Sequence, residues 1–242
     1  AAVNAGRGLI NYIGHGSEFS WVTSGFDTSH VKQLTNTNGA WPMIWSVACV
    51  NGSFEMPEDC FAEAWLKAGT VDAPAGAIGM VGASTNMAWE PPCTWQKSII
   101  EEFMIPEVVF TGGALHYFGM LKTCEQYGDT EESEGNQLIE QCIFFGDSSV
   151  VLRNDIPQVP TVSLAGGTAR SLRLVVQAGD KVVKGATVVV SSEHRSAKAV
   201  TNAQGVASIP ASLAAATDVT VTVTGPNLEP LVNQSIELTG TE

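Results

Sequence analysis

Residues 43–49 read Met-Ile-Trp-Ser-Val-Ala-Cys, and this apolar stretch decides how the first part of the chain folds. An apolar run of about four to eight residues is typical of a strand buried on both faces, as in a parallel sheet. Residues 8–13 (Gly-Leu-Ile-Asn-Tyr-Ile) and 77–81 (Ala-Ile-Gly-Met-Val) have the same character. The sequence therefore predicts three buried strands in the first third of the chain.

Stretches in which apolar residues recur at helical spacing lie between and after these runs. We predict helices over residues 28–35, 59–68, 94–105, 113–127 and 136–145. Strands that alternate with helices indicate an α/β fold with a mostly parallel sheet covered on both faces. The expected fold of this part is a three-layer α/β unit.

The amino-acid composition and the charge of the chain change near residue 156. All 9 Phe, 6 Trp, 3 Tyr and 5 Cys residues lie at or before position 145. Residues 1–156 carry 6 Lys and Arg against 19 Asp and Glu, whereas residues 157–242 carry 6 of each. Because residues 154–160 form a polar, proline-bearing linker, we expect two domains, at residues 1–156 and 157–242.

The second segment is rich in β-branched residues separated by turn residues. Such runs lie at residues 171–176, 186–190, 200–201, 205–209 and 219–224. Several short strands in about 80 residues fit a small all-β, Ig-like sandwich. The Cys…Trp…Cys pattern of antibody domains is missing, so the expected likeness is one of architecture.

Net charge and hydropathy exclude two classes of partner. The formal net charge of −13 argues against a nucleic-acid partner, whose phosphates require a basic surface. No segment approaches the ~18 uninterrupted apolar residues of a membrane span. The chain is therefore not expected to bind nucleic acid or to span a membrane.

The cysteines and the acidic residues raise the question of disulfides and metals. An odd number of cysteines leaves at least one unpaired, and pairs such as Cys60–Cys93 or Cys124–Cys142 stay open. The sequence contains no C-x₂-C pair, so no zinc site and no cofactor are expected. The acidic run at residues 129–134 is interpreted as a solvated loop, with a structural calcium site as the alternative.

Two loops carry the residue types of thiol catalysis. His15 follows the first predicted strand within Gly-His-Gly, and Cys49 follows the second. If the two strands are parallel neighbours, both residues emerge at the same edge of the sheet. The intervening stretch of about 33 residues is long enough for the crossover that such a pair requires.

An imidazole beside a thiol can take its proton and create the nucleophilic thiolate. In this interpretation Cys49 attacks a carbonyl, and the backbone N–H groups of Gly16 and Cys49 form an oxyanion hole. The competing interpretation is that Cys49 is an inert packed thiol and His15 an ordinary loop residue.

The two loops resemble those of a known family. Residues 12–18 (Tyr-Ile-Gly-His-Gly-Ser-Glu) and 47–54 (Val-Ala-Cys-Val-Asn-Gly-Ser-Phe) resemble the His and Cys loops of the gingipain-type cysteine peptidases, peptidase family C25. More remotely, they are similar to the loops of legumain and the caspases. The resemblance extends through residues 60–66, 76–84 and 145–150, and an Ig-like domain follows in that family too.

The resemblance implies a caspase-like catalytic domain and a set of residue roles. It implies that Cys49 is the nucleophile, that His15 is the general base and acid, and that Gly16 and Cys49 supply the oxyanion N–H groups. Trp89 is expected to line the primary specificity pocket. The implied activity is hydrolysis of peptide bonds in protein or peptide substrates, and cleavage after basic residues is typical of the family. The resemblance also implies a secreted or cell-surface location.

In that family an upstream half precedes the His loop and contains the acidic partner of the histidine. The chain is therefore expected to be the carboxyl-terminal part of the catalytic domain plus the Ig-like domain, with the upstream part as its partner. Glu18 and Glu55 are nearby acids, but neither is assigned to His15. Two alternatives stay open: a non-catalytic surface or assembly module, and a sortase-like transpeptidase that uses the same thiol.

Overall fold

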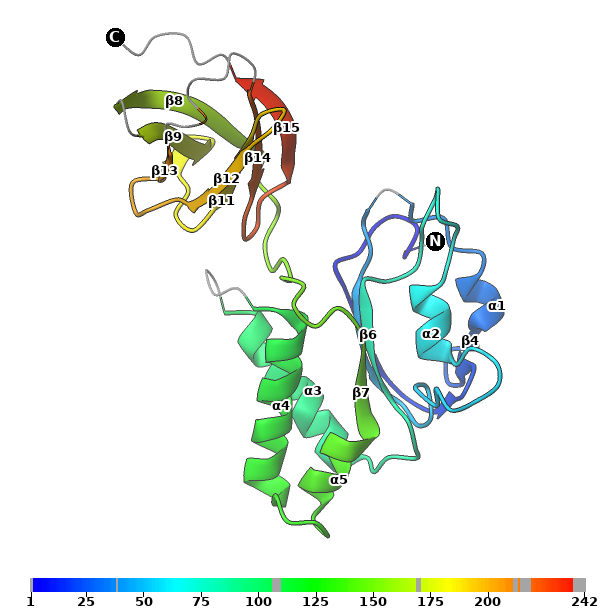
Figure 1. The fold of residues 1–242 in the computed structure, drawn as a ribbon. Coiled ribbons are helices and arrows are strands. Elements are labelled where there is room, and N and C mark those ends of the chain that lie inside the picture. Colours follow the sequence, from blue (N-terminus) through cyan, green and yellow to red (C-terminus); the bar gives the residue numbers. More distant parts are fainter. Residues whose placement is uncertain are drawn as a thin grey trace. The chain divides into compact units, whose positions relative to one another are not determined.

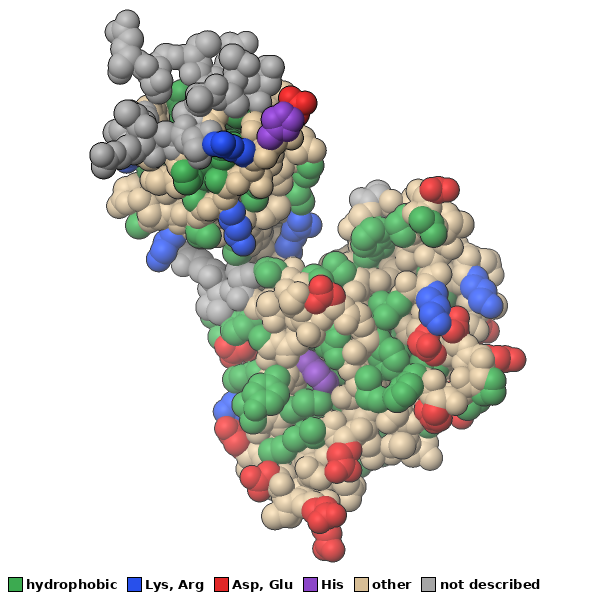
Figure 2. All heavy atoms as spheres, viewed as in Figure 1, with side chains coloured by type: hydrophobic (Ala, Val, Ile, Leu, Met, Phe, Trp, Pro, Cys, Tyr) green, Lys and Arg blue, Asp and Glu red, His purple; other side chains and the backbone are tan. Residues whose placement is uncertain are grey.

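The computed structural model describes residues 2–37, 39–105, 110–168, 171–210, 213 and 219–236. The chain divides into two compact units, Ala1–Leu152 and Arg153–Glu242 (Figure 1). This division falls slightly before the boundary expected at residue 156. On the face drawn in Figure 2, acidic side chains are more frequent than basic ones on the first unit, in line with its negative charge.

The first unit is built on a mixed four-stranded sheet in the order β1-β5-β6-β7. The strands are β1 (Leu9–Ile13), β5 (Met43–Val47), β6 (Gly79–Ala83) and β7 (Cys142–Gly146). The first three are parallel and correspond to the three predicted apolar runs, whereas β7 is antiparallel to β6. All residues of β5 and β6 are buried, which is why these strands are apolar without alternation.

Helices cover both faces of this sheet. They are α1 (Thr28–Val31), α2 (Phe61–Leu66), α3 (Glu90–Phe103), α4 (Gly112–Tyr127) and α5 (Glu134–Gln141). The side chains of α1 and α2 share one core with Ile44 and Met80, and those of α3, α4 and α5 share another with Trp45 and Val81. Because successive strand residues point to opposite faces, β5 and β6 supply both cores, and the unit has three layers.

The helix predicted over residues 136–145 is wrong beyond Gln141. The chain leaves α5 at Cys142 and becomes β7, in which Cys142 pairs with Ala83 and Gly146 with Gly79. A short apolar run is ambiguous between helix and strand by spacing alone, and here pairing with β6 decides the outcome. The predicted helix over residues 94–105 begins earlier, at Glu90, because Pro91 and Pro92 fit the first helical turn.

A small antiparallel sheet that was not predicted follows His15. It consists of β2 (Gly16–Ser17), β3 (Ser20–Trp21) and β4 (Phe26–Asp27), each two residues long. Asp27 ends it and caps α1, since its carboxylate accepts from the N–H groups of Ser29 and His30. The loop that carries His15 is thus folded back on itself as a hairpin.

The strands described in the second unit form two antiparallel sheets that pack over one aliphatic core. One sheet contains β8 (Pro160–Thr168), β9 (Ser171–Ala178), β10 (Lys181–Val182) and β13 (Val206–Pro210). The other contains β11 (Thr187–Ser191), β12 (Ser196–Val200), β14 (Val219–Thr224) and β15 (Leu231–Ile236). Leucine, isoleucine and valine residues from both sheets form the core.

His116 on α4 is buried in the first unit and makes the stability of that unit depend on pH. Its side chain is 8% exposed, lies edge-on to Trp95 and packs near Phe144. Burial lowers the pKa of His116 from 6.5 to about 4, partly offset by a hydrogen bond to the backbone of Cys142. The unfolded chain therefore binds a proton that the folded chain excludes between these pH values.

Above pH 6.5 the imidazole is neutral in both states, so we expect its titration to leave the free energy of unfolding unchanged. As the pH drops from 6.5 to 4, we expect the free energy of unfolding to fall. The loss should reach about 3 kcal/mol below pH 4. Urea unfolding at several pH values should show a shallower pH dependence in His116→Phe, whereas the control His194→Gln, at an exposed site, should follow the unaltered chain. Parallel curves for all three proteins would contradict this assignment.

Candidate active site

The structure brings His15 and Cys49 to the same edge of the sheet. Strands β1 and β5 are parallel and in register, with Ile13 opposite Val47, and the N–H of Gly14 donates to the Val47 carbonyl at 3.1 Å. His15 and Cys49 each follow two residues after this last pair. The carboxyl ends of parallel strands are where α/β sheets place their sites.

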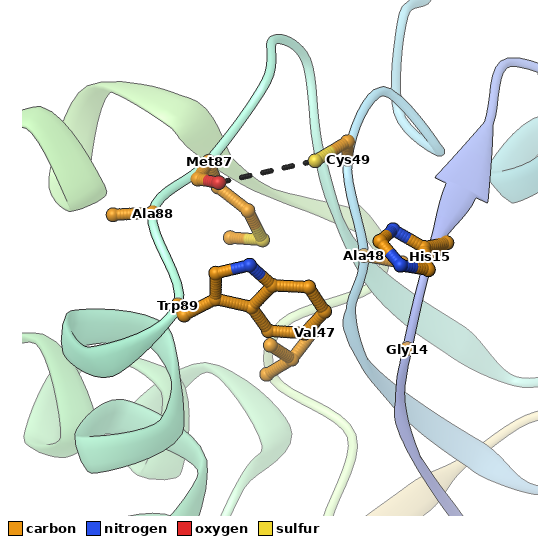
Figure 3. A pocket seen from close by; sticks show the side chains of 8 residues that line it. All are labelled: Gly14, His15, Val47, Ala48, Cys49, Met87, Ala88 and Trp89. Carbon is orange, nitrogen blue, oxygen red and sulfur yellow. Dashed lines mark hydrogen bonds between the residues drawn. The ribbon is translucent and has the colours of Figure 1, made fainter.

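One pocket is lined by both loops and by the segment that follows β6 (Figure 3). Its lining residues are Gly14, His15, Val47, Ala48, Cys49, Met87, Ala88 and Trp89. The Trp89 indole is 56% exposed and lies edge-on to the His15 ring, with centroids 5.3 Å apart. Three predicted site residues therefore line one pocket: His15 and Cys49, predicted for thiol chemistry, and Trp89, predicted for the specificity pocket.

The Cys49 thiol does not hydrogen-bond to His15 in this structure. It donates instead to the carbonyl oxygen of Met87, with a sulfur–oxygen distance of 3.9 Å, as drawn in Figure 3. The thiol is thus directed to the segment that follows β6 and not to the His15 ring. Contacts between reacting groups are often loose in the absence of substrate, so this arrangement is compatible with a thiol that turns to His15.

The backbone directly after Cys49 is strained. Val50 has a φ of 52°, in the left-handed region that a β-branched residue rarely adopts. The turn is held by hydrogen bonds from Val50 N–H to the Thr85 carbonyl at 3.1 Å and from Gly52 N–H to the Ala83 carbonyl at 2.8 Å. Strain of this kind costs about 1–3 kcal/mol and concentrates at functional sites.

Two backbone N–H groups next to the pocket do not donate to a neighbouring strand. In the described part of the chain the N–H of Cys49 donates to no other group. The N–H of Val22 donates to the His15 carbonyl, which makes Gly16 and Trp21 a non-hydrogen-bonded pair. The N–H of Gly16 therefore points away from β3.

The main chain of His15 is held firmly, but its ring has no acidic partner in the described residues. Its N–H donates to Thr23 Oγ1 at 2.9 Å, and its carbonyl accepts from the Tyr12 hydroxyl at 2.9 Å. Among the described residues, the histidines that form ion pairs are His30 and His194. Neither Glu18 nor Glu55 forms an ion pair with the His15 ring among the described residues.

The candidate disulfides and the candidate cation loop have no counterpart here. All five cysteines are free, so neither Cys60–Cys93 nor Cys124–Cys142 is formed. Within the described ranges, no three His, Cys, Asp or Glu side chains are placed to hold a metal ion. None of the described helices is both long enough and apolar enough to cross a bilayer.

Sequence reasoning missed the polar residues that join the two loops. Ser46 is fully buried in β5, and Asn51 is fully buried two residues after Cys49. The Ser46 hydroxyl donates to Asn51 Oδ1 at 2.9 Å and accepts from Trp21 Nε1 at 2.9 Å. A single serine in an otherwise apolar strand was the available signal, because a buried hydroxyl requires partners.

A three-layer α/β unit with a thiol and an imidazole at neighbouring strand ends has the architecture of the caspase-like cysteine peptidases. The model of the family described as Peptidase family C25 matches residues 1–153. The chain belongs to this family.

Its relatives include gingipains of Porphyromonas gingivalis. Gingipain R2 of that organism is 33% identical over 229 residues, which cover 93% of this chain and 30% of the relative. The crystal structure of the Arg-specific cysteine proteinase gingipain R matches with a TM-score of 0.80 and 31% identity, over 98% of this chain and 54% of that one. The complex of the pro- and mature domains of the Porphyromonas gingivalis protease RgpB matches with a TM-score of 0.79 and 30% identity, over 98% and 55%.

Proposed function

We propose that this chain carries the Cys–His dyad of a family C25 cysteine endopeptidase, with Cys49 as nucleophile and His15 as general base and acid. The observation that carries the proposal is the register of β1 and β5, which ends both strands at the rim of one pocket. The strained turn after Cys49 and the free N–H groups beside it support the same assignment.

In the proposed reaction the Cys49 thiol gives its proton to His15, and the sulfur attacks the carbonyl carbon of the scissile peptide bond. The N–H groups of Cys49 and Gly16 donate to the oxygen that becomes negative. His15 then returns the proton to the departing amine, which leaves an acyl-thioester on Cys49. Water, deprotonated by His15, hydrolyses this thioester and restores the thiol.

We propose cleavage after basic residues, by analogy with the Arg-specific relative. The described pocket has apolar walls from Val47, Met87 and Trp89, and an indole face suits a cationic side chain. No carboxylate lines the described pocket, so we infer that the acid that pairs with the substrate's charge, and the acidic partner of His15, belong to the upstream part of the protease.

The domain assignment is part of the same proposal. We assign residues 1–156 to a caspase-like catalytic domain and residues 157–242 to an Ig-like domain, in a protease that is secreted or cell-surface bound. Protein and peptide substrates, and the upstream part of the same protease, are the proposed partners. The complex of pro- and mature domains in the RgpB relative supports contact between parts of such a protease.

Differential alkylation tests the proposal. At pH 7 iodoacetamide should label Cys49 at least about 10-fold faster than Cys93 and Cys124, because a neighbouring imidazole favours the thiolate. The two comparison thiols are also partly exposed, and burial raises the pKa of both, with smaller contributions from Glu90 and Asp129. His15→Ala should remove the excess rate of Cys49.

Uniformly slow labelling of all accessible thiols would overturn the dyad and favour a non-catalytic module. The buried Cys60 and Cys142 provide the baseline, since burial raises their pKa values to about 11 and about 12. Mapping the products of a cleaved peptide in the presence of an added amine separates hydrolysis from a transpeptidase, which would transfer the acyl group to the amine.

A further inference from the structure

Asn51 is buried between the two loops of the proposed dyad and uses its side chain to join them. Its Nδ2 donates to the carbonyl of Ser17 at 2.7 Å and to the carbonyl of Ser20 at 3.0 Å. Both carbonyls belong to the β2–β3 hairpin, which begins immediately after His15. Its Oδ1 accepts from the Ser46 hydroxyl at 2.9 Å. An amide on the Cys49 turn that donates to two carbonyls of the hairpin fixes one loop against the other.

The same network reaches the main chain of His15. The Ser46 hydroxyl accepts from Trp21 Nε1, and the Trp21 ring stacks on Tyr12 with centroids 4.5 Å apart. The Tyr12 hydroxyl donates to the His15 carbonyl at 2.9 Å. Contacts therefore run without a gap from Asn51, on the Cys49 turn, to the peptide group of His15.

The two loops also pack closely against each other. A Cβ placed on Gly16 would overlap the Cys49 carbonyl oxygen and lie 3.0 Å from Asn51 Nδ2. The first turn of α2 also holds both loops. Phe61 N–H donates to the Glu18 carbonyl at 2.7 Å, and Ala62 N–H donates to the Asn51 carbonyl at 2.9 Å.

We propose that Asn51 is a positioning residue for the proposed thiol–imidazole reaction: it sets the distance between Cys49 and His15 by tying the His15 hairpin to the Cys49 turn. This inference rests on the proposed function. Asn51 does not line the pocket, so it acts through the two loops and not through contact with substrate.

Removal of the Asn51 side chain takes one donor away from each of two hairpin carbonyls and removes the side-chain tie between the hairpin and the Cys49 turn. A thiol with an ordinary pKa of about 8.5 is only about 3% ionised at pH 7. A hairpin that no longer brings His15 within reach of the thiol should therefore lower alkylation of Cys49 by about 10- to 30-fold. Thiol reactivity is the readout because a merely structural asparagine would leave it unchanged.

Asn36 offers a matched control in the same unit. It is 1% exposed, against 0% for Asn51, and it also joins two distant segments. Its Nδ2 donates to the Gly76 carbonyl at 2.8 Å and its Oδ1 accepts from the Gly76 N–H at 2.9 Å. Since the Asn36 side chain does not hydrogen-bond to either loop of the dyad, Asn36→Ala removes a comparable buried amide and should not change the labelling of Cys49.

The experiment compares iodoacetamide labelling of Cys49 in the unaltered full chain, Asn51→Ala, Asn51→Asp and Asn36→Ala between pH 5 and 8. We expect Asn51→Ala to lose about 10-fold or more at pH 7 and Asn36→Ala to stay within about twofold. Asn51→Asp keeps the shape but places an oxygen against the two carbonyls, unless the acid is protonated and donates. Its labelling rate relative to the unaltered chain should therefore rise as the pH falls.

The outcomes separate the two proposals. If Cys49 of the unaltered chain reacts no faster than Cys93, the proposed function fails. If the unaltered chain reacts fast and both Asn51 variants keep its rate and pH profile, the dyad stands and the positioning role of Asn51 is overturned. Should Asn51→Ala not fold, the pH profile of the isosteric Asn51→Asp decides alone.

Discussion

Replacement of Cys49 with alanine is expected to abolish peptide-bond cleavage by the protease, with a loss of about 10³-fold or more in kcat/KM. The sulfur is the atom that would bond to the substrate carbonyl, and no other side chain in the pocket can replace it. The fold should be unaffected, because the thiol is partly exposed and makes a single weak hydrogen bond, to Met87. The measurement is cleavage of a peptide with arginine before the scissile bond.

His15→Ala should cause a loss of similar size, since the two groups act as one unit and their effects do not add. Cys93→Ala is the control, because it removes a partly exposed thiol outside the pocket and should retain full activity. Cleavage that survives in Cys49→Ala at a tenth of the original rate or more would show that the nucleophile lies elsewhere.

Gly16→Ala is expected to have the second largest effect, on both stability and activity. The new Cβ would overlap the carbonyl oxygen of Cys49 and lie 2.9 Å from Ala48 Cβ. Backbone atoms cannot rotate away as a side chain can, so the hairpin must move and carry His15 and the Gly16 N–H with it. We expect a loss of about 1–3 kcal/mol in the free energy of unfolding and about 10²-fold in kcat/KM.

Gly8→Ala is the matched control for this substitution. Gly8 precedes the same strand, β1, and a Cβ placed there meets no atom within 4 Å. Thermal unfolding and peptide cleavage of Gly8→Ala should match the unaltered chain. If Gly16→Ala were as stable and as active as Gly8→Ala, the close contact between the His15 and Cys49 loops would be wrong.

Much of the first unit could be predicted from short apolar runs. Strands β1, β5 and β6 correspond to three such runs, and the approach of His15 and Cys49 follows from a general property of parallel neighbours. Strand β7 could not be predicted, because residues 142–145 suit a helix or a strand equally until β6 is there to pair with them. The hairpin after His15 was missed for a similar reason, since strands of two residues have no pattern.

The sequence by itself determined which residue types end the two strands: an imidazole between glycines and a thiol before a tight turn. Only the tertiary structure decided what holds them there. Asn51 bonds to residues 34 and 31 positions away, and Trp21 bonds to a serine 25 positions away. Such hydrogen bonds depend on where the chain returns in space, and the spacing of residues along the chain does not contain that information.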